Sequence, residues 1–113
     1  WTLLVYIINK KSPKLKLKDD FFKDNFLINR ILIILEKFLK LHIKNQIENG
    51  AEIIQIFDSW AGLLNEKDLP NYVYVPTLNL VDYIKSLKIS KYFFISFFKL
   101  SRSVSNIFGS SPP

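Results

Sequence analysis

The sequence lacks cysteine and methionine, and its 113 residues include only three glycines and a single histidine. Without cysteine the chain has neither a disulfide framework nor a thiolate metal site, which is compatible with a reducing compartment. His42 lies between Leu41 and Ile43 in an apolar helical pattern, which favours a structural role over catalysis. No Ser-His-Asp set, metal-ligand cluster or glycine-rich phosphate loop is present. We therefore expect no metal and no cofactor.

Acidic residues are also few, so that 16 Lys and Arg against 10 Asp and Glu give a formal net charge of +6. The lysines are scattered over polar helix faces, as a Lys-, Ile-, Asn- and Phe-rich coding bias would produce, and no basic patch with a recognisable module is visible. The apolar runs are shorter than the roughly 20 residues that span a bilayer. We expect neither a nucleic acid nor a membrane partner.

Residues 25–49 carry the clearest secondary-structure signal. Their apolar residues recur at steps of three and four, which predicts an amphipathic helix. Asn25 is the expected N-cap, and Gly50 is the expected glycine just after the helix end. Additional apolar residues widen the apolar face, so we expect burial on more than one side in the full protein: Ile33, Ile34 and Leu41.

A short strand is predicted at Glu52–Phe57, where β-branched Ile53, Ile54 and Ile56 form a run too short for a helix. Apolar residues on both sides of the pleat indicate a parallel strand covered on both faces. The polar loop 58–62 follows at the strand's carboxyl end, where α/β folds bind ligands. Ser59 is therefore the first candidate for a functional residue.

The flanking segments give weaker predictions. Thr2 is a possible cap for a helix over the first nine residues, and Pro76 is expected to interrupt the helical pattern because the residue before a proline avoids the helical region. The other expected elements are a lysine-rich linker over 10–18, a short helical turn over 19–24, a short helix from Leu69-Pro70 capped by Asp68, a helix over Thr77–Leu87 and a strand over Tyr92–Phe98.

Two motifs in this chain resemble the uroporphyrinogen decarboxylase family. GAEIIQIFDSWAG, residues 50–62, is similar to the family's GA-x-x-(V/L/I)-Q-(I/L)-F-(D/E)-S-x-x-G segment, and WTLLVY, residues 1–6, is similar to its WTL-x-x-Y motif. Residues 72–88 resemble the helix that follows in the family. The resemblance therefore covers residues 1–88, a partial domain. Residues 89–113 diverge from it, and we hypothesise a shift of reading frame near Ser90.

The resemblance implies an α/β fold, a fragment of a (β/α)8 TIM barrel that is incomplete in this chain. Such a barrel needs about 250 residues. The length of 113 residues and the start at Trp1 fit an internal fragment. An incomplete sheet leaves strand edges open, which is an aggregation hazard.

The family resemblance also implies an activity, the conversion of uroporphyrinogen III to coproporphyrinogen III by removal of four acetate carboxylates as CO2, without cofactor or metal. The family's enzymes belong to haem and chlorophyll synthesis, act in the cytoplasm and form homodimers. A protonated pyrrole serves as the electron sink while fixed charges stabilise it. The family's catalytic aspartate, arginines and C-terminal histidine correspond to no residue of this chain, so we expect the fragment alone to be inactive.

Three residues match substrate-binding positions of the family. Ser59 is expected to hydrogen-bond a carboxylate of the tetrapyrrole, Tyr6 to place its hydroxyl in the cleft, and Phe57 to line the pocket. Each also has a structural alternative: a loop serine bonded to the backbone for Ser59, and core packing for the two aromatic residues. Asp58 could be a general acid, but side chains alternate across a strand, so Asp58 and Ser59 cannot both point into the barrel. We therefore expect Asp58 to make a structural hydrogen bond. Trp60 is expected to pack within the loop.

Two alternatives remain open. The related methyltransferase barrels share the fold but use a cysteine-containing zinc site, and FDSWAG fits the decarboxylases better. A small, basic, non-catalytic helical binding protein would account for the charge and the apolar helix. It would leave the strand and the two spaced motifs unexplained.

Overall fold

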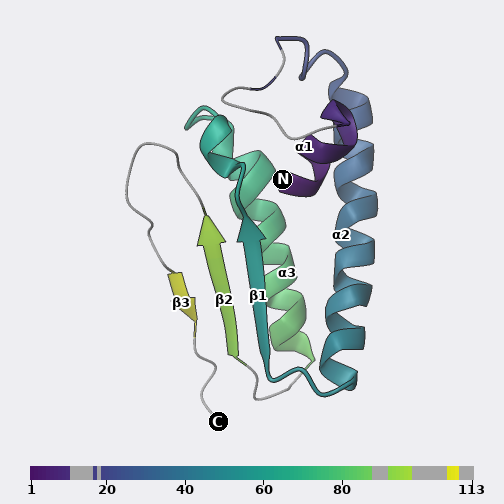
Figure 1. Ribbon diagram of the computed structural model, residues 1–113, viewed down its shortest axis with the longest axis vertical. Coiled ribbons are helices and arrows are strands. Elements are labelled where there is room, and N and C mark those ends of the chain that lie inside the picture. The colour runs from purple at the N-terminus through teal and green to yellow at the C-terminus, as the bar shows by residue number, and fades with distance from the viewer. Residues whose placement is uncertain (11–16, 18, 88–91, 98–106, 110–113) are drawn as a thin grey trace.

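The computed structural model describes residues 1–10, 17, 19–87, 92–97 and 107–109, the last two ranges by their backbone alone. The predicted lysine-rich linker and the junction near Ser90 lie mostly outside these residues. Figure 1 shows the order of the described elements: α1 (Thr2–Asn9), α2 (Asn25–Glu48), β1 (Ile53–Asp58), a 3-10 turn (Ala61–Leu63), a π-helical turn (Pro70–Tyr74), α3 (Val75–Ser86), β2 (Tyr92–Phe97) and β3 (Ile107–Gly109).

The described strands form one sheet in the order β1-β2-β3. β1 and β2 are parallel, with Ile53 opposite Tyr92 and Asp58 opposite Phe97, whereas β3 runs antiparallel to β2. Helix α3 connects the two parallel strands, as such a pair requires. The predicted parallel strand and the strand that follows it are thus confirmed. β1 begins and ends one residue later than predicted. The antiparallel β3 was not predicted, and a barrel of eight parallel strands has no counterpart for it.

Local capping sets both ends of α2. The Asp24 carboxylate accepts a hydrogen bond from the Leu27 backbone N–H at 2.8 Å, so Asp24 is the N-cap and Asn25 is already helical. The prediction of Asn25 as the cap was wrong by one residue. Gly50 has φ +97° and its N–H bonds the Ile47 carbonyl at 3.1 Å, which confirms it as the residue that ends the helix.

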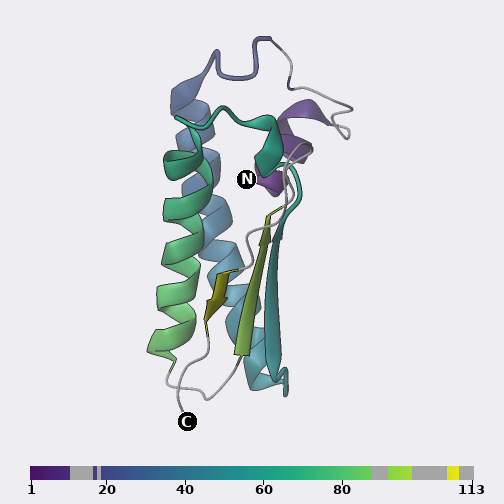
Figure 2. The same ribbon diagram turned by 90° about the vertical axis from the view of Figure 1, so that its left-hand side faces the viewer.

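The core between sheet and helices is made by one face of β1. Ile54 is buried together with residues of both long helices: Ile43 and Ile47 of α2, and Leu80, Val81 and Ile84 of α3. Figure 2 shows α2 and α3 on the same side of the sheet. Each fully buried isoleucine or leucine contributes about 1.5–3 kcal/mol. On the opposite face, Ile53 and Phe57 are 57% and 64% exposed. The expectation that β1 is covered on both faces is therefore wrong for the described part of the chain, because no described element lies over that face.

A second core joins the beginning of the chain to its middle. Leu4 and Val5 of α1 are fully buried with Ile28 of α2 and Val73 of the π-helical turn. The Trp1 ring extends this cluster by packing against three aromatic rings, with centroid distances of 5.4 Å to Phe21, 6.1 Å to Phe22 and 5.5 Å to Tyr72. Phe21 and Phe22 pack into this cluster, although residues 19–23, predicted as a short helical turn, form turns and not a helix.

Glu36 links the two long helices. Its carboxylate accepts a hydrogen bond from Lys40, four residues further along α2, at 2.8 Å, and another from Asn79 of α3 at 3.1 Å. Burial acts to raise the pKa of Glu36, but the hydrogen bonds from Lys40 and Asn79 and the lysine charge together hold the pKa below its usual value. The ionised form of Glu36 is thus the one that the packing of α2 against α3 favours.

The outer side of α2 remains apolar and exposed. Ile33, Ile34 and Leu41 are 70%, 49% and 50% exposed, so their burial in a longer protein stays a prediction. None of the described helices is both long and apolar enough to cross a membrane.

Pro76 does not interrupt α3, contrary to expectation. Val75 is helical, at φ −62° and ψ −49°, and α3 begins there directly after the wider π-helical turn. Pro76 thus lies in the first turn of α3, where a missing N–H removes no necessary helical bond. Asp68 does not cap the preceding turn with its side chain either; its backbone carbonyl accepts from Tyr72 N–H.

Gly50 provides a test of the junction between α2 and β1. A Cβ at this position would meet nothing within 4 Å, so a substitution is limited by the positive φ alone. We expect Gly50→Ala to lower the free energy of unfolding by about 1–2 kcal/mol. Gly50→Asn should cost less, because asparagine tolerates positive φ better. Urea titration measures both, and equal stability of the alanine variant and the unsubstituted protein would contradict the assignment.

Candidate functional site

The carboxylate of Asp58 is the centre of a polar network at the end of β1. Asp58 is 5% exposed, and its Oδ1 accepts two hydrogen bonds from Thr2, one from the backbone N–H at 2.9 Å and one from Oγ1 at 2.7 Å. The backbone nitrogen of Trp1 lies 3.4 Å from Asp58 Oδ2. The expectation that Asp58 makes a structural hydrogen bond is confirmed, and its partner is the start of α1.

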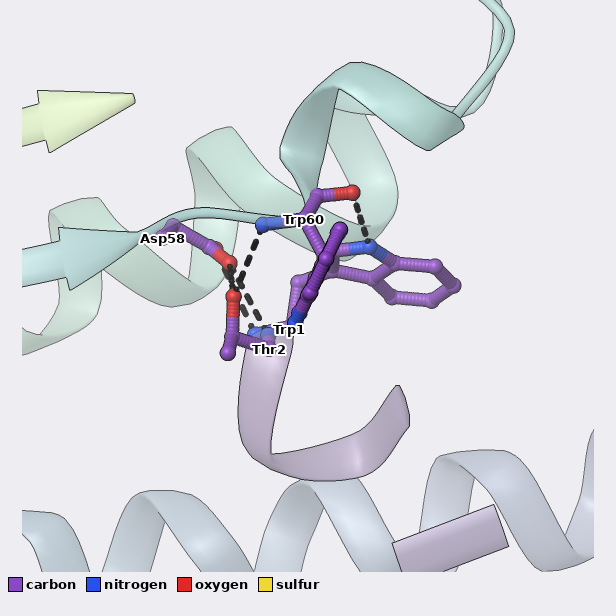
Figure 3. A network of polar contacts seen from close by, with 4 residues as sticks. All are labelled: Trp1, Thr2, Asp58 and Trp60. Carbon is purple, nitrogen blue, oxygen red and sulfur yellow. Dashed lines mark hydrogen bonds and ion pairs between the residues drawn. The ribbon is translucent and has the colours of Figure 1, made fainter. Parts of the chain in front are cut away.

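The Thr2 hydroxyl also connects this network to Trp60 in the loop after β1. Thr2 Oγ1 accepts a hydrogen bond from the Trp60 backbone N–H at 3.0 Å, and the Trp1 ring Nε1 donates to the Trp60 carbonyl at 2.9 Å (Figure 3). The prediction that Thr2 caps α1 was wrong: Trp1 is the N-cap residue, no side chain caps the helix, and the hydroxyl bonds across the fold. The WTL and FDSW segments are therefore one structural unit.

Ser59 lies inside this unit, between two residues that Thr2 holds. Exposure alternates along β1 and into the loop, with Ile54 and Asp58 buried while Phe57 and Ser59 are exposed. Phe57 lies on the uncovered face of β1, and Ser59, in the turn directly after the strand, is exposed as a continued alternation would place it. The structure keeps both side chains out of the core, so the core-packing alternative for Phe57 does not hold in the described part of the chain.

Tyr6 approaches the same loop from α1. Tyr6 is 43% exposed, and its ring lies edge-on to the Trp60 ring, with centroids 6.4 Å apart. Trp60 packs within the loop as predicted, and its ring Nε1 is buried without a hydrogen-bond partner among the described residues. The two motifs thus bring Tyr6 close to the residue after Ser59, and the third predicted residue, Phe57, lies on the strand before it.

A crevice of about 270 Å³ lies on the other side of β1, toward the helices. Its walls are mainly leucine and isoleucine side chains of α2, β1 and α3, and it reaches Phe57 and Asp58 but neither Tyr6 nor Ser59. His42 and Glu36 also line it. Among the described residues no group of three His, Cys, Asp or Glu side chains could hold a metal ion. The crevice lies near the lower end of the about 300–1,000 Å³ of ordinary ligand pockets, and neither Tyr6 nor Ser59 lines it. The open end of β1, where the two motifs meet, is therefore the candidate site.

Sequence reasoning missed the role of Thr2. Its signal was present, because Thr2 and Asp58 belong to the two quoted motifs, but the link between them is a tertiary contact across 56 positions. The rules for helix starts predict that a threonine at such a position is the N-cap, because they consider only partners that are close in sequence.

The family model described as "Uroporphyrinogen decarboxylase (URO-D)" matches residues 1–101. The chain belongs to the uroporphyrinogen decarboxylase family. The match extends past residue 88, and the division of the chain at residue 88 remains a prediction.

Similar curated proteins carry the same name. Proteins named "Uroporphyrinogen decarboxylase" are 38% identical over 88 residues in Orientia tsutsugamushi (strain Ikeda), 35% over 88 in Prochlorococcus marinus (strain MIT 9215) and 36% over 88 in Rickettsia bellii (strain RML369-C). These alignments cover 75–76% of this chain and 25–26% of the relatives. The chain thus spans about a quarter of the length of the relatives it matches. No solved structure matches it.

Asp58 should be a major determinant of stability at this site. Asp58→Ala removes the charged acceptor of two hydrogen bonds and leaves the Thr2 N–H without its partner, so we expect the free energy of unfolding to fall by about 2–3 kcal/mol. The matched control is Asp82→Ala, because Asp82 is exposed on α3 and its loss should change stability by less than about 0.5 kcal/mol. Urea unfolding compares the two variants, and equal losses would refute the network's importance.

Proposed function

We propose that this chain is a segment of a longer uroporphyrinogen decarboxylase and supplies part of the wall of its tetrapyrrole cleft. The observation that carries the proposal is the interlocking of the two family motifs through Asp58 and Thr2, which leaves Ser59 exposed at the carboxyl end of a parallel strand. Carboxyl ends of parallel strands are where α/β enzymes bind their substrates.

The segment fits part of a (β/α)8 barrel. In support, β1 and β2 are parallel with α3 between them in sequence, and α2 and α3 cover only one face of the sheet. We assign that face to the outside of the barrel. The uncovered face, with Ile53 and Phe57, then faces the barrel interior.

Three side chains of the segment are assigned to substrate binding. The Ser59 hydroxyl donates a hydrogen bond to a substrate carboxylate, the Tyr6 hydroxyl does so from α1, and the Phe57 ring packs against the apolar face of the macrocycle. Their exposure supports these roles, because each presents its side chain outside the core. These groups orient the tetrapyrrole; they do not take part in proton transfer.

The remaining requirements of the reaction fall on other parts of the longer protein. The carboxylate of each of the four acetate arms leaves as CO2 after its pyrrole is protonated, and the protonated pyrrole accepts the electron pair of the broken C–C bond. A proton then adds to the remaining CH2 carbon, which becomes a methyl group, and the pyrrole loses the proton that it had gained. The cationic intermediate needs fixed negative charge, and the substrate carboxylates need fixed positive charge. The cleft face of this segment, Phe57, Ser59 and Tyr6, provides neither. From the family resemblance we also propose a homodimer that acts in the cytoplasm.

The activity assignment has a direct test. The longer protein should convert uroporphyrinogen III to coproporphyrinogen III through the intermediates with seven, six and five carboxylates, which anaerobic incubation followed by oxidation and chromatography resolves. The purified 113-residue chain should show no turnover, because it forms only one part of the cleft. Failure of the longer protein to decarboxylate, or turnover by the short chain, would each contradict the proposal.

Ser59 and Tyr6 can be tested separately in the longer protein. Loss of one hydrogen bond to a charged group costs about 1.5 kcal/mol, so Ser59→Ala should raise the KM for uroporphyrinogen III about tenfold with little change in kcat. Tyr6→Phe should raise KM in the same way. Ser86→Ala on α3, whose hydroxyl bonds only the Tyr83 carbonyl among the described residues, is the control and should leave KM unchanged. An unaltered KM in both site variants would remove these residues from the binding site.

A further inference from the structure

We propose that Thr2 is a positioning residue that sets the location of Ser59 in the substrate site; this inference rests on the proposed function. The Thr2 side chain bonds both sequence neighbours of Ser59, the Asp58 carboxylate at 2.7 Å and the Trp60 N–H at 3.0 Å. Ser59 is thereby held between two fixed points while its own side chain remains exposed.

The geometry requires a hydroxyl at position 2. A threonine hydroxyl has one donor hydrogen and two acceptor lone pairs. Thr2 uses the donor on Asp58 and one lone pair for Trp60, so a single atom joins the strand end to the loop (Figure 3). A β-branched side chain has few χ1 rotamers, which keeps this atom in place. Serine retains the bonding capacity of the hydroxyl, whereas valine retains the shape without it.

The network restrains the Trp60 backbone from both sides. Its N–H donates to Thr2 Oγ1 and its carbonyl accepts from the Trp1 ring at 2.9 Å, so the peptide groups that follow Ser59 cannot rotate freely. Removal of the Thr2 hydroxyl would leave the Trp60 N–H without this hydrogen bond. Asp58 would remain bonded to the Thr2 backbone N–H, so the start of α1 would stay docked.

Positioning of this kind matters because substrate contacts tolerate little displacement. A shift of about 1 Å in a binding or catalytic group is enough to lose most of its contribution. The hydrogen bonds within the described residues do not involve the Ser59 side chain, so its placement depends on the backbone on either side. Thr2 acts through Ser59 and does not itself touch substrate.

The kinetic test uses the longer protein with Thr2→Val, Thr2→Ser, Ser59→Ala and the double variant Thr2→Val/Ser59→Ala. We expect Thr2→Val to raise the KM for uroporphyrinogen III about fivefold with kcat within about twofold, and Thr2→Ser to stay within about twofold of the unsubstituted protein. The double variant should match Ser59→Ala alone, because a residue that acts through Ser59 adds nothing once its hydroxyl is gone. Multiplicative effects in the double variant, or an unchanged KM in Thr2→Val, would overturn the inference.

A second measurement is independent of activity. Amide hydrogen exchange should show the Trp60 N–H protected in the unsubstituted protein, less protected in Thr2→Val and restored in Thr2→Ser. Lack of Trp60 protection in the unsubstituted protein would overturn the inference even if Thr2→Val does not fold. Absence of decarboxylation by the unsubstituted protein would instead refute the proposed function, and the exchange data would then decide whether Thr2 fixes the loop.

Discussion

The fold of this segment depends on the pairing of a buried carboxylate at the end of β1 with the first residues of the chain. An ionised carboxylate out of water is costly unless hydrogen-bond donors surround it. Asp58 meets this requirement with the Thr2 N–H and hydroxyl, 56 positions away in the sequence. Leu4 and Val5 pack α1 into an apolar core with α2, and this polar link joins the start of α1 to the end of the strand. The Trp1 ring then completes the adjoining aromatic cluster.

The pleat of β1 separates the side chains that stabilise the fold from those of the candidate site. Ile54 and Asp58 point toward the helices, where one is packed in the core and the other anchors α1. The alternate side chains, Phe57 and Ser59, are left for contacts outside the core. A shift of one residue in the strand would exchange the two sets, since side chains alternate with a period of two. The Asp58–Thr2 bonds fix this register at the end of the strand where the candidate site lies.

The parts of the structure that follow from local pattern could be predicted from the sequence. Apolar periodicity located α2, Gly50 marked its end, and a β-branched run located β1 to within one residue. Family motifs pointed to Ser59, and strand alternation assigned Asp58 to a structural bond. Thr2 was misassigned because its partners are distant in sequence, and Val75-Pro76 because the preceding π-helical turn alters where α3 begins. Local rules contain no information on either feature.

The uncovered apolar surfaces support the proposal that this chain is a segment of a longer protein. Ile53 and Phe57 on the sheet and Ile33 on α2 are each more than half exposed, on opposite sides of the layer that the core occupies. Soluble proteins rarely leave such large apolar groups open on two faces without a partner surface. The relatives are about four times as long as the matched segment, so they have enough chain to cover both. In the proposed function, a cleft on the β1 face would gain its remaining walls and its charged groups from the same polypeptide that completes the sheet, so that substrate binding would depend on completion of the fold.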